Sequence, residues 1–156
     1  MSFNKHWPRW IKASILKYVD TNKPLGAFVY YEGQERKTSE YSAWFEVRLD
    51  GPHALERSKD QWRLVVLLNV LISCSVDRDL YHVDRMVGEL AQVLDATIPT
   101  FKFGDGVDDN PLISLGCLNL KTDSLRDGIV IHHYGQIEPK TKLLQATVEA
   151  SYWIDL

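Results

Sequence analysis

The stretch of the sequence with the most evident metal-binding potential is "HHY", which comprises His132, His133 and Tyr134. The segment around it, "GIVIHHYGQI", is apolar and β-branched, which predicts a strand. Adjacent side chains of a strand point to opposite faces, so the two imidazoles cannot easily bind one ion. No cysteine or carboxylate stands at a spacing typical of metal ligands. We therefore expect no metal site, with one histidine half-buried and the other exposed.

Two polar stretches are the other candidates for ion binding or acid–base chemistry. "GDGVDDN" (104–110) lacks the ligand spacing and final Glu of a calcium loop, and it lacks the Lys and Ser/Thr of a phosphate-binding loop. His82 and Asp84 in "YHVDR" could move a proton, but no serine or cysteine in a nucleophile motif accompanies them. We therefore predict no catalytic, metal-binding or cofactor-binding residues, no cofactor, and no enzymatic activity.

The composition of the chain limits the classes of protein to which it can belong. The chain has 156 residues, of which 45% are hydrophobic and 25% charged, and this is typical of one soluble domain spanning 1–156. A net charge of −3 argues against a dedicated nucleic-acid-binding protein. Cys74 and Cys117 lie in apolar, strand-like segments, so we expect both to be buried free thiols.

Nothing in the sequence indicates a membrane protein. The start, "MSFNKHWPRW", lacks the apolar core of a signal peptide. The most apolar run, "LVVLLNVLISC", is too short to span a bilayer. Trp7 and Trp10 lie beside lysine and arginine, as in an interfacial membrane helix, but we expect their helix to pack on the sheet of a soluble domain.

The elements that would position these residues follow from hydrophobic periodicity. We predict helices over 7–20 and 79–97, and strands over 27–32, 42–50, 60–76, 112–120, 128–137 and 142–156. The stretch "GPHALERSKD" (51–60) is expected to be a connection, and the last two strands a hairpin. The fold class is α+β: a mostly antiparallel sheet of about six strands packed with two α-helices, in the order α-β-β-β-α-β-β-β. The strand over 60–76 is long, so we expect it to bend or to project beyond the core.

Two tryptophans stand on the polar-face register of their strands. Trp44 shares its face with Glu46 and Arg48, and Trp153 shares its face with Asp155. A large aromatic residue at such a position is covered either by a helix or by another subunit. We take these five residues as the candidate subunit or partner interface.

The chain resembles the tail-terminator, or tail-completion, proteins of long-tailed bacteriophages. The resemblance covers nearly the whole chain and lies in a similar length, a similar order of helices and strands, and a similar pattern of apolar and polar residues. It consists of the opening helix "WPRWIKASILKYV", the strands "GAFVYYE" and "SAWFEVRL", the long strand "WRLVVLLNVLIS", the helix "DLYHVDRMVGELAQVLDATIP" and the closing "LLQATVEASYWIDL".

The resemblance implies a structural virion protein that forms a ring, in this family hexameric, at the end of the tail nearest the head. Such a ring caps the tail tube, ends its polymerisation and joins the tail to the head. The implied partners are further copies of the chain, the tail tube protein and a neck or head-completion protein. Genomic DNA would pass through without specific binding, and the mild acidity of the chain suits such a channel.

Two alternative functions remain open at this point. One is another small neck or head-completion protein of the virion. The other, which we rank lower because no convergent set of polar residues was found, is a module that binds a small molecule between its sheet and helices.

Overall fold

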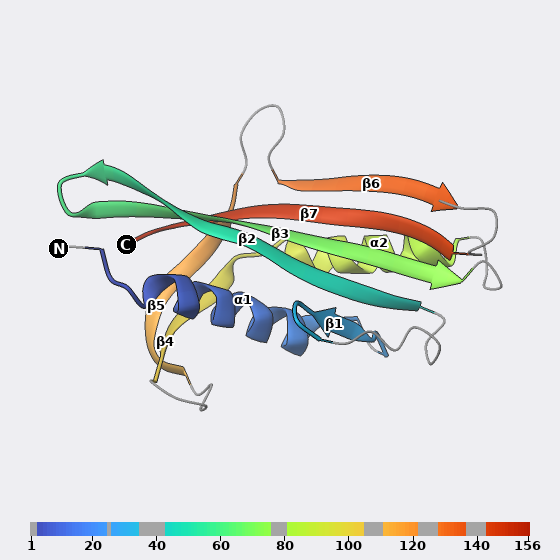
Figure 1. Ribbon diagram of the computed structural model, residues 1–156, viewed down its shortest axis with the longest axis horizontal. Coiled ribbons are helices and arrows are strands. Elements are labelled where there is room, and N and C mark those ends of the chain that lie inside the picture. The colour runs from blue at the N-terminus through green and yellow to red at the C-terminus, as the bar shows by residue number, and fades with distance from the viewer. Residues whose placement is uncertain are drawn as a thin grey trace.

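The computed structural model describes residues 3–24, 26–34, 43–75, 81–104, 111–121, 128–136 and 143–156, with the side chains of 111, 112, 135 and 136 left out. Its elements are α1 (Trp7–Asn22), β1 (Val29–Tyr31), β2 (Ala43–Ser58), β3 (Gln61–Ser75), α2 (His82–Leu94), β4 (Ile98–Phe103), β5 (Pro111–Leu120), β6 (Ile129–Gln136) and β7 (Leu143–Asp155). The predicted α+β class and the order of elements are confirmed (Figure 1). The sheet has seven strands, and β4 is the additional one.

The sheet is built around three long neighbouring strands, β2, β3 and β7, which have 16, 15 and 13 residues. The strand order is β1-β2-β3-β7-β5-β4, and β6 also pairs with β7. β1 runs parallel to β2, whereas the other described pairs are antiparallel. β6 pairs with the first part of β7 and β5 with its end, at Trp153 and Tyr152. β4 and β5 then lead away from the long strands toward α1 (Figure 1).

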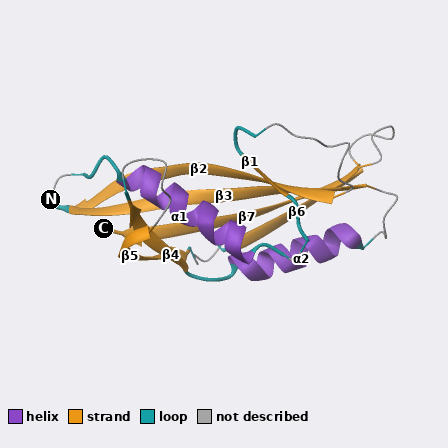
Figure 2. Cartoon of the chain, turned by 90° about the horizontal axis from the view of Figure 1, so that it is seen from below, coloured by secondary structure: helices purple, strands orange, loops and turns teal. Residues whose placement is uncertain are grey.

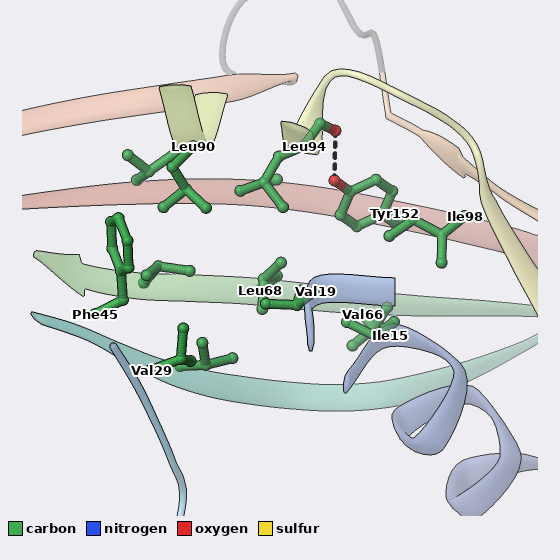
Figure 3. Packing of buried hydrophobic residues seen from close by; sticks show 14 of the residues in the cluster. Ile15, Val19, Val29, Phe45, Val66, Leu68, Leu90, Leu94, Ile98 and Tyr152 are labelled. Carbon is green, nitrogen blue, oxygen red and sulfur yellow. Dashed lines mark hydrogen bonds between the residues drawn. The ribbon is translucent and has the colours of Figure 1, made fainter. Parts of the chain in front are cut away.

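The hydrophobic core lies on one face of the long strands. The alternation predicted for β3 is present: its even-numbered residues Leu64, Val66, Leu68, Val70, Ile72 and Cys74 are fully buried. They share one cluster with buried residues of both helices, such as Ile15 of α1 and Leu90 of α2. Figure 3 shows these side chains between the sheet and the helices, and Figure 2 shows both helices on the same side of the long strands. The opposite face of the sheet carries neither helix.

α1 packs on the sheet through a stripe of helical period. Trp10, Ile11, Ile15 and Val19 are buried on one side of the helix, which confirms that it covers the core. The hydroxyl of Ser14 joins this helix to β4, because it donates to the carbonyl of Trp10 at 2.8 Å and accepts from the backbone N–H of Phe101 at 2.9 Å. α1 therefore sits between the long strands and β4.

α2 is shorter than the predicted helix over 79–97, whose first residues lie outside the described part of the chain. It ends at Leu94 because the chain must turn there into β4, and the carbonyl of Leu94 accepts a 2.6 Å hydrogen bond from the hydroxyl of Tyr152. Pro99, two residues beyond the end of the predicted helix, lies inside β4. A proline is tolerated there because β4 pairs only with β5 among the described strands.

Three local expectations require correction. The connection expected over 51–60 is mostly strand, since β2 continues to Ser58 and pairs with β3 as a long hairpin. Cys74 is buried as expected, but Cys117 is exposed, because β5 leaves the core where it turns away from β7. His132 and His133 are both exposed, because β6 is described with a strand partner on one edge only. Residues 105–110 of the acidic stretch lie outside the described residues.

Candidate interface surfaces

Both candidate tryptophans lie on the sheet face that carries no helix, which we call the open face. It is defined by the odd-numbered residues of β3 and their partners: Trp44 is opposite Ser73, and Trp153 is opposite Val65. Trp44 is only 4% exposed, whereas Trp153 is half-buried. Because α1 and α2 cover the other face, neither helix covers these rings.

The five predicted interface residues form two separate groups on this face. Trp44 and Glu46 are buried and Arg48 is exposed near one end of β2, whereas Trp153 and Asp155 lie near the end of β7. The register of the strands places Trp44 and Trp153 eight positions apart along β3, which is about 26 Å at roughly 3.3 Å per residue. The predicted set is therefore not one site.

The group around Trp44 is largely enclosed. Nε1 of Trp44 is buried without a hydrogen-bond partner in the described part of the chain. A shallow pocket of about 140 Å³ adjoins Glu46 and Arg48, and Tyr30 and Tyr31 of β1 contribute to its wall. Since Trp44 and Glu46 have little exposed surface, Arg48 is the residue of this group that is available to a partner.

The group around Trp153 includes Arg63, which the sequence analysis did not select. The guanidinium of Arg63 lies 4.2 Å from the centre of the Trp153 ring. It also donates two hydrogen bonds to the carboxylate of Asp155, at 2.8 and 2.9 Å, and these lower the pKa of that carboxyl. Three side chains from two strands thus hold one another in place on the open face. Tryptophan and arginine are the residue types that contribute most to protein interfaces.

A second feature that the sequence analysis missed is the tip of the β2–β3 hairpin, residues 53–61, which we call the arm. Every residue of the arm is exposed, and Leu55 exposes 59% of its surface. Figure 1 shows the arm extending past the ends of the other long strands. Gly51 and Pro52 suggested a turn, which hid the strand. The signal that could have revealed the arm was the length of the hydrophobic pattern in β3. From that length we expected the strand either to bend or to project beyond the core.

A pocket of about 400 Å³ lies at the base of the arm. Its lining residues are Arg57, Gln61, Trp62, Arg63, Asp155 and Leu156. The backbone of Leu156 and that of Trp62 exchange two hydrogen bonds, at 2.9 and 3.0 Å, so the end of β7 is fixed to the base of the arm. The pocket therefore lies between the arm and the end of β7, and Arg63 and Asp155 contribute to its wall.

No protein-family model matches the chain, and no curated protein shows a significant match to it. Within the described ranges, no group of three or more histidine, cysteine, aspartate or glutamate residues is placed to hold a metal ion. No helix in the same residues has the length and apolarity needed to cross a bilayer.

Proposed function

We propose that this chain is a structural protein of a bacteriophage tail that assembles into a ring on the end of the tail tube. The ring would stop further growth of the tube and provide the surface to which the head is joined. The observation that carries the proposal is the arm. Nine consecutive exposed residues, paired as a hairpin with one register shift between Glu56 and Ser58, contribute almost nothing to the core of their own chain. A stable strand pair of this kind serves contact with another molecule.

The distribution of surfaces supports assembly into a ring. A closed ring requires two different surfaces on each copy, so that one surface of a copy meets the other surface of the next. The arm projects at one end of the molecule, and the exposed strand β6 lies on the opposite edge of the long strands (Figure 1). The open face, with its Arg63–Trp153 pair, provides a third surface for a tube or neck protein.

The resemblance to tail-terminator proteins, in length, order of elements and residue pattern, supports placing this ring at the end of the tail nearest the head. The partners on this proposal are further copies of the chain, the tail tube protein and a neck or head-completion protein. The net charge of −3 is compatible with DNA passing through the ring, since a basic lining would retain the phosphates by counterion release. The protein would act through its interfaces and would catalyse no reaction.

The test is to add the purified chain to growing tail tubes of the phage that encodes it and to image the products. We expect a ring at one end of each tube and a tube length that no longer increases. Binding along the tube wall, or no binding, would contradict the proposal. Trp153→Ala should reduce capping, whereas Ile113→Ala, at a residue that is 61% exposed on β5, serves as the matched control and should cap normally.

A further inference from the structure

The outer edge of β6 is built to accept another strand. β6 pairs with β7 along one edge, and no described strand pairs with its other edge. Residues 131–134 are all exposed, and Ile131 and Tyr134 expose 42% and 53% of their surface. Protected sheet edges usually carry lysine, proline or other charges, yet between 128 and 136 there is no proline, lysine, arginine, aspartate or glutamate. An unprotected edge of this length is a template for strand addition.

The arm offers a second free edge on the other side of the same sheet. β1 pairs with β2 only from Phe45 to Val47, so in the described chain no strand pairs with the outer edge of β2 beyond Val47. Pro52 lacks an N–H and a register shift follows Asp50, which together interrupt this edge before the arm begins. From His53 to Ser58 this edge has no strand partner among the described residues and its side chains are exposed, although a second register shift separates Glu56 from Ser58. This part of β2 projects away from the rest of the chain (Figure 1).

The outer edge of β6 and the outer edge of β2 can pair between copies of the chain. In the order β2-β3-β7-β6 they lie at opposite sides, so joining β2 of one copy to β6 of the next continues the sheet from copy to copy. A contact between two unlike edges is head-to-tail and can close into a ring, whereas β6 against β6 would stop at a dimer. Leu55 lies on the open-face register, as do Val130 and His132, so one continuous sheet places these side chains on the same face.

We propose that the arm of one copy adds as a strand to the outer edge of β6 of a second copy. This inference rests on the proposed function for the ring, but it names the two segments that would form the subunit contact. Backbone N–H and C=O groups of both edges would be satisfied across the contact. Leu55, exposed in the single copy, would lie beside the open-face side chains of β6 and contact them.

The test uses single cysteines in a background with the exposed native thiol removed by Cys117→Ser. Leu55→Cys and His132→Cys are purified separately, concentrated, mixed and treated with a short bifunctional thiol reagent. We expect a cross-linked dimer from the mixture but not from His132→Cys alone. A dimer from His132→Cys alone would show that β6 meets β6, and no dimer from the mixture would show that the arm does not meet β6. Either result would overturn the inference.

Strand addition also predicts a period of two. Cysteines at 130, 132 and 134 should cross-link to Cys at position 55 more readily than cysteines at 131 and 133, which lie on the other face of β6. Cross-linking without this alternation would mean that the arm merely touches β6, and it would overturn strand pairing.

A charge placed in the contact provides a second measurement. Leu55→Lys should weaken self-association about tenfold, the equivalent of about 1.4 kcal/mol. Ile113→Lys, at an equally exposed residue outside the contact, should leave self-association unchanged. Rings that still form and still cap tubes with Leu55→Lys would overturn this inference and leave the proposed function standing. Failure of the unmodified chain to cap tubes would contradict the proposed function instead.

Discussion

The guanidinium of Arg63 lies 4.2 Å above the ring of Trp153 and is held there by two hydrogen bonds to Asp155. This arrangement accounts for an aromatic residue on the polar register of a strand. The ring is half-buried, with a cation of its own chain over one side, and its exposed part lies on the open face. A contribution of Trp153 to a partner contact can therefore be measured separately from its contribution to folding.

Trp153→Ala should lower the free energy of unfolding by about 2 kcal/mol, since the variant loses the contact with Arg63 and also the burial of part of the ring. Truncation of a tryptophan in a core costs about 3–5 kcal/mol. Urea denaturation of the two proteins measures the difference. A loss in the core range would contradict our placement of Trp153 on the surface.

Ile154→Asp should unfold the chain, although it lies one residue further along the same strand. Ile154 is 3% exposed and belongs to the core cluster on the helix face, so the substitution buries a carboxylate among apolar side chains. The far-ultraviolet circular dichroism of the variant should show loss of the native sheet. A folded variant would contradict the assignment of opposite faces to residues 153 and 154.

Tyr152→Phe tests the contact between β7 and the end of α2. The tyrosine hydroxyl is buried and donates to the carbonyl of Leu94 at 2.6 Å (Figure 3). The same carbonyl also accepts from the backbone N–H of Ala96 at 2.9 Å, so loss of the hydroxyl removes one hydrogen bond and should cost about 0.5–1.5 kcal/mol in urea denaturation. Tyr134→Phe is the control: this residue is 53% exposed, its hydroxyl makes only a long 3.3 Å contact with the hydroxyl of Thr147, and the change in stability should be less than about 0.5 kcal/mol.

The same tyrosine should make the fold sensitive to alkaline pH. Burial, followed by the nearby Tyr18 and Asp95, raises the pKa of Tyr152 well above its ordinary value of 10.0. Above about pH 10 the unfolded chain loses this proton while the folded chain keeps it, so stability is full below that pH and falls as pH rises. The free energy of unfolding should fall between about pH 9 and about pH 11, and less steeply in Tyr152→Phe. Equal slopes in the two proteins would contradict this cause.

The sequence predicts those parts of the fold that depend on local pattern. The even positions of β3 and the apolar stripe of α1 have clear periods, because each is buried on one side only. The arm was missed because nothing covers it: without burial, its residues have no hydrophobic alternation to detect. Arg63 was missed for a related reason, since its relation to Trp153 depends on which strands are neighbours. Periodicity gives the face of a residue but not the strand beside it.

The two cysteines allow a direct check on where the core ends. Cys117 is exposed on β5, whereas Cys74 is fully buried on the helix face of β3. A thiol reagent should therefore modify one cysteine rapidly in the folded chain and the second only after unfolding. In Cys117→Ser the rapid reaction should disappear, and in Cys74→Ser it should remain. Because a buried thiol reacts only when the structure opens, the slow rate at Cys74 also reports the stability of β3 at the centre of the sheet. Rapid reaction of both thiols in the folded chain would show that β3 is not buried as described.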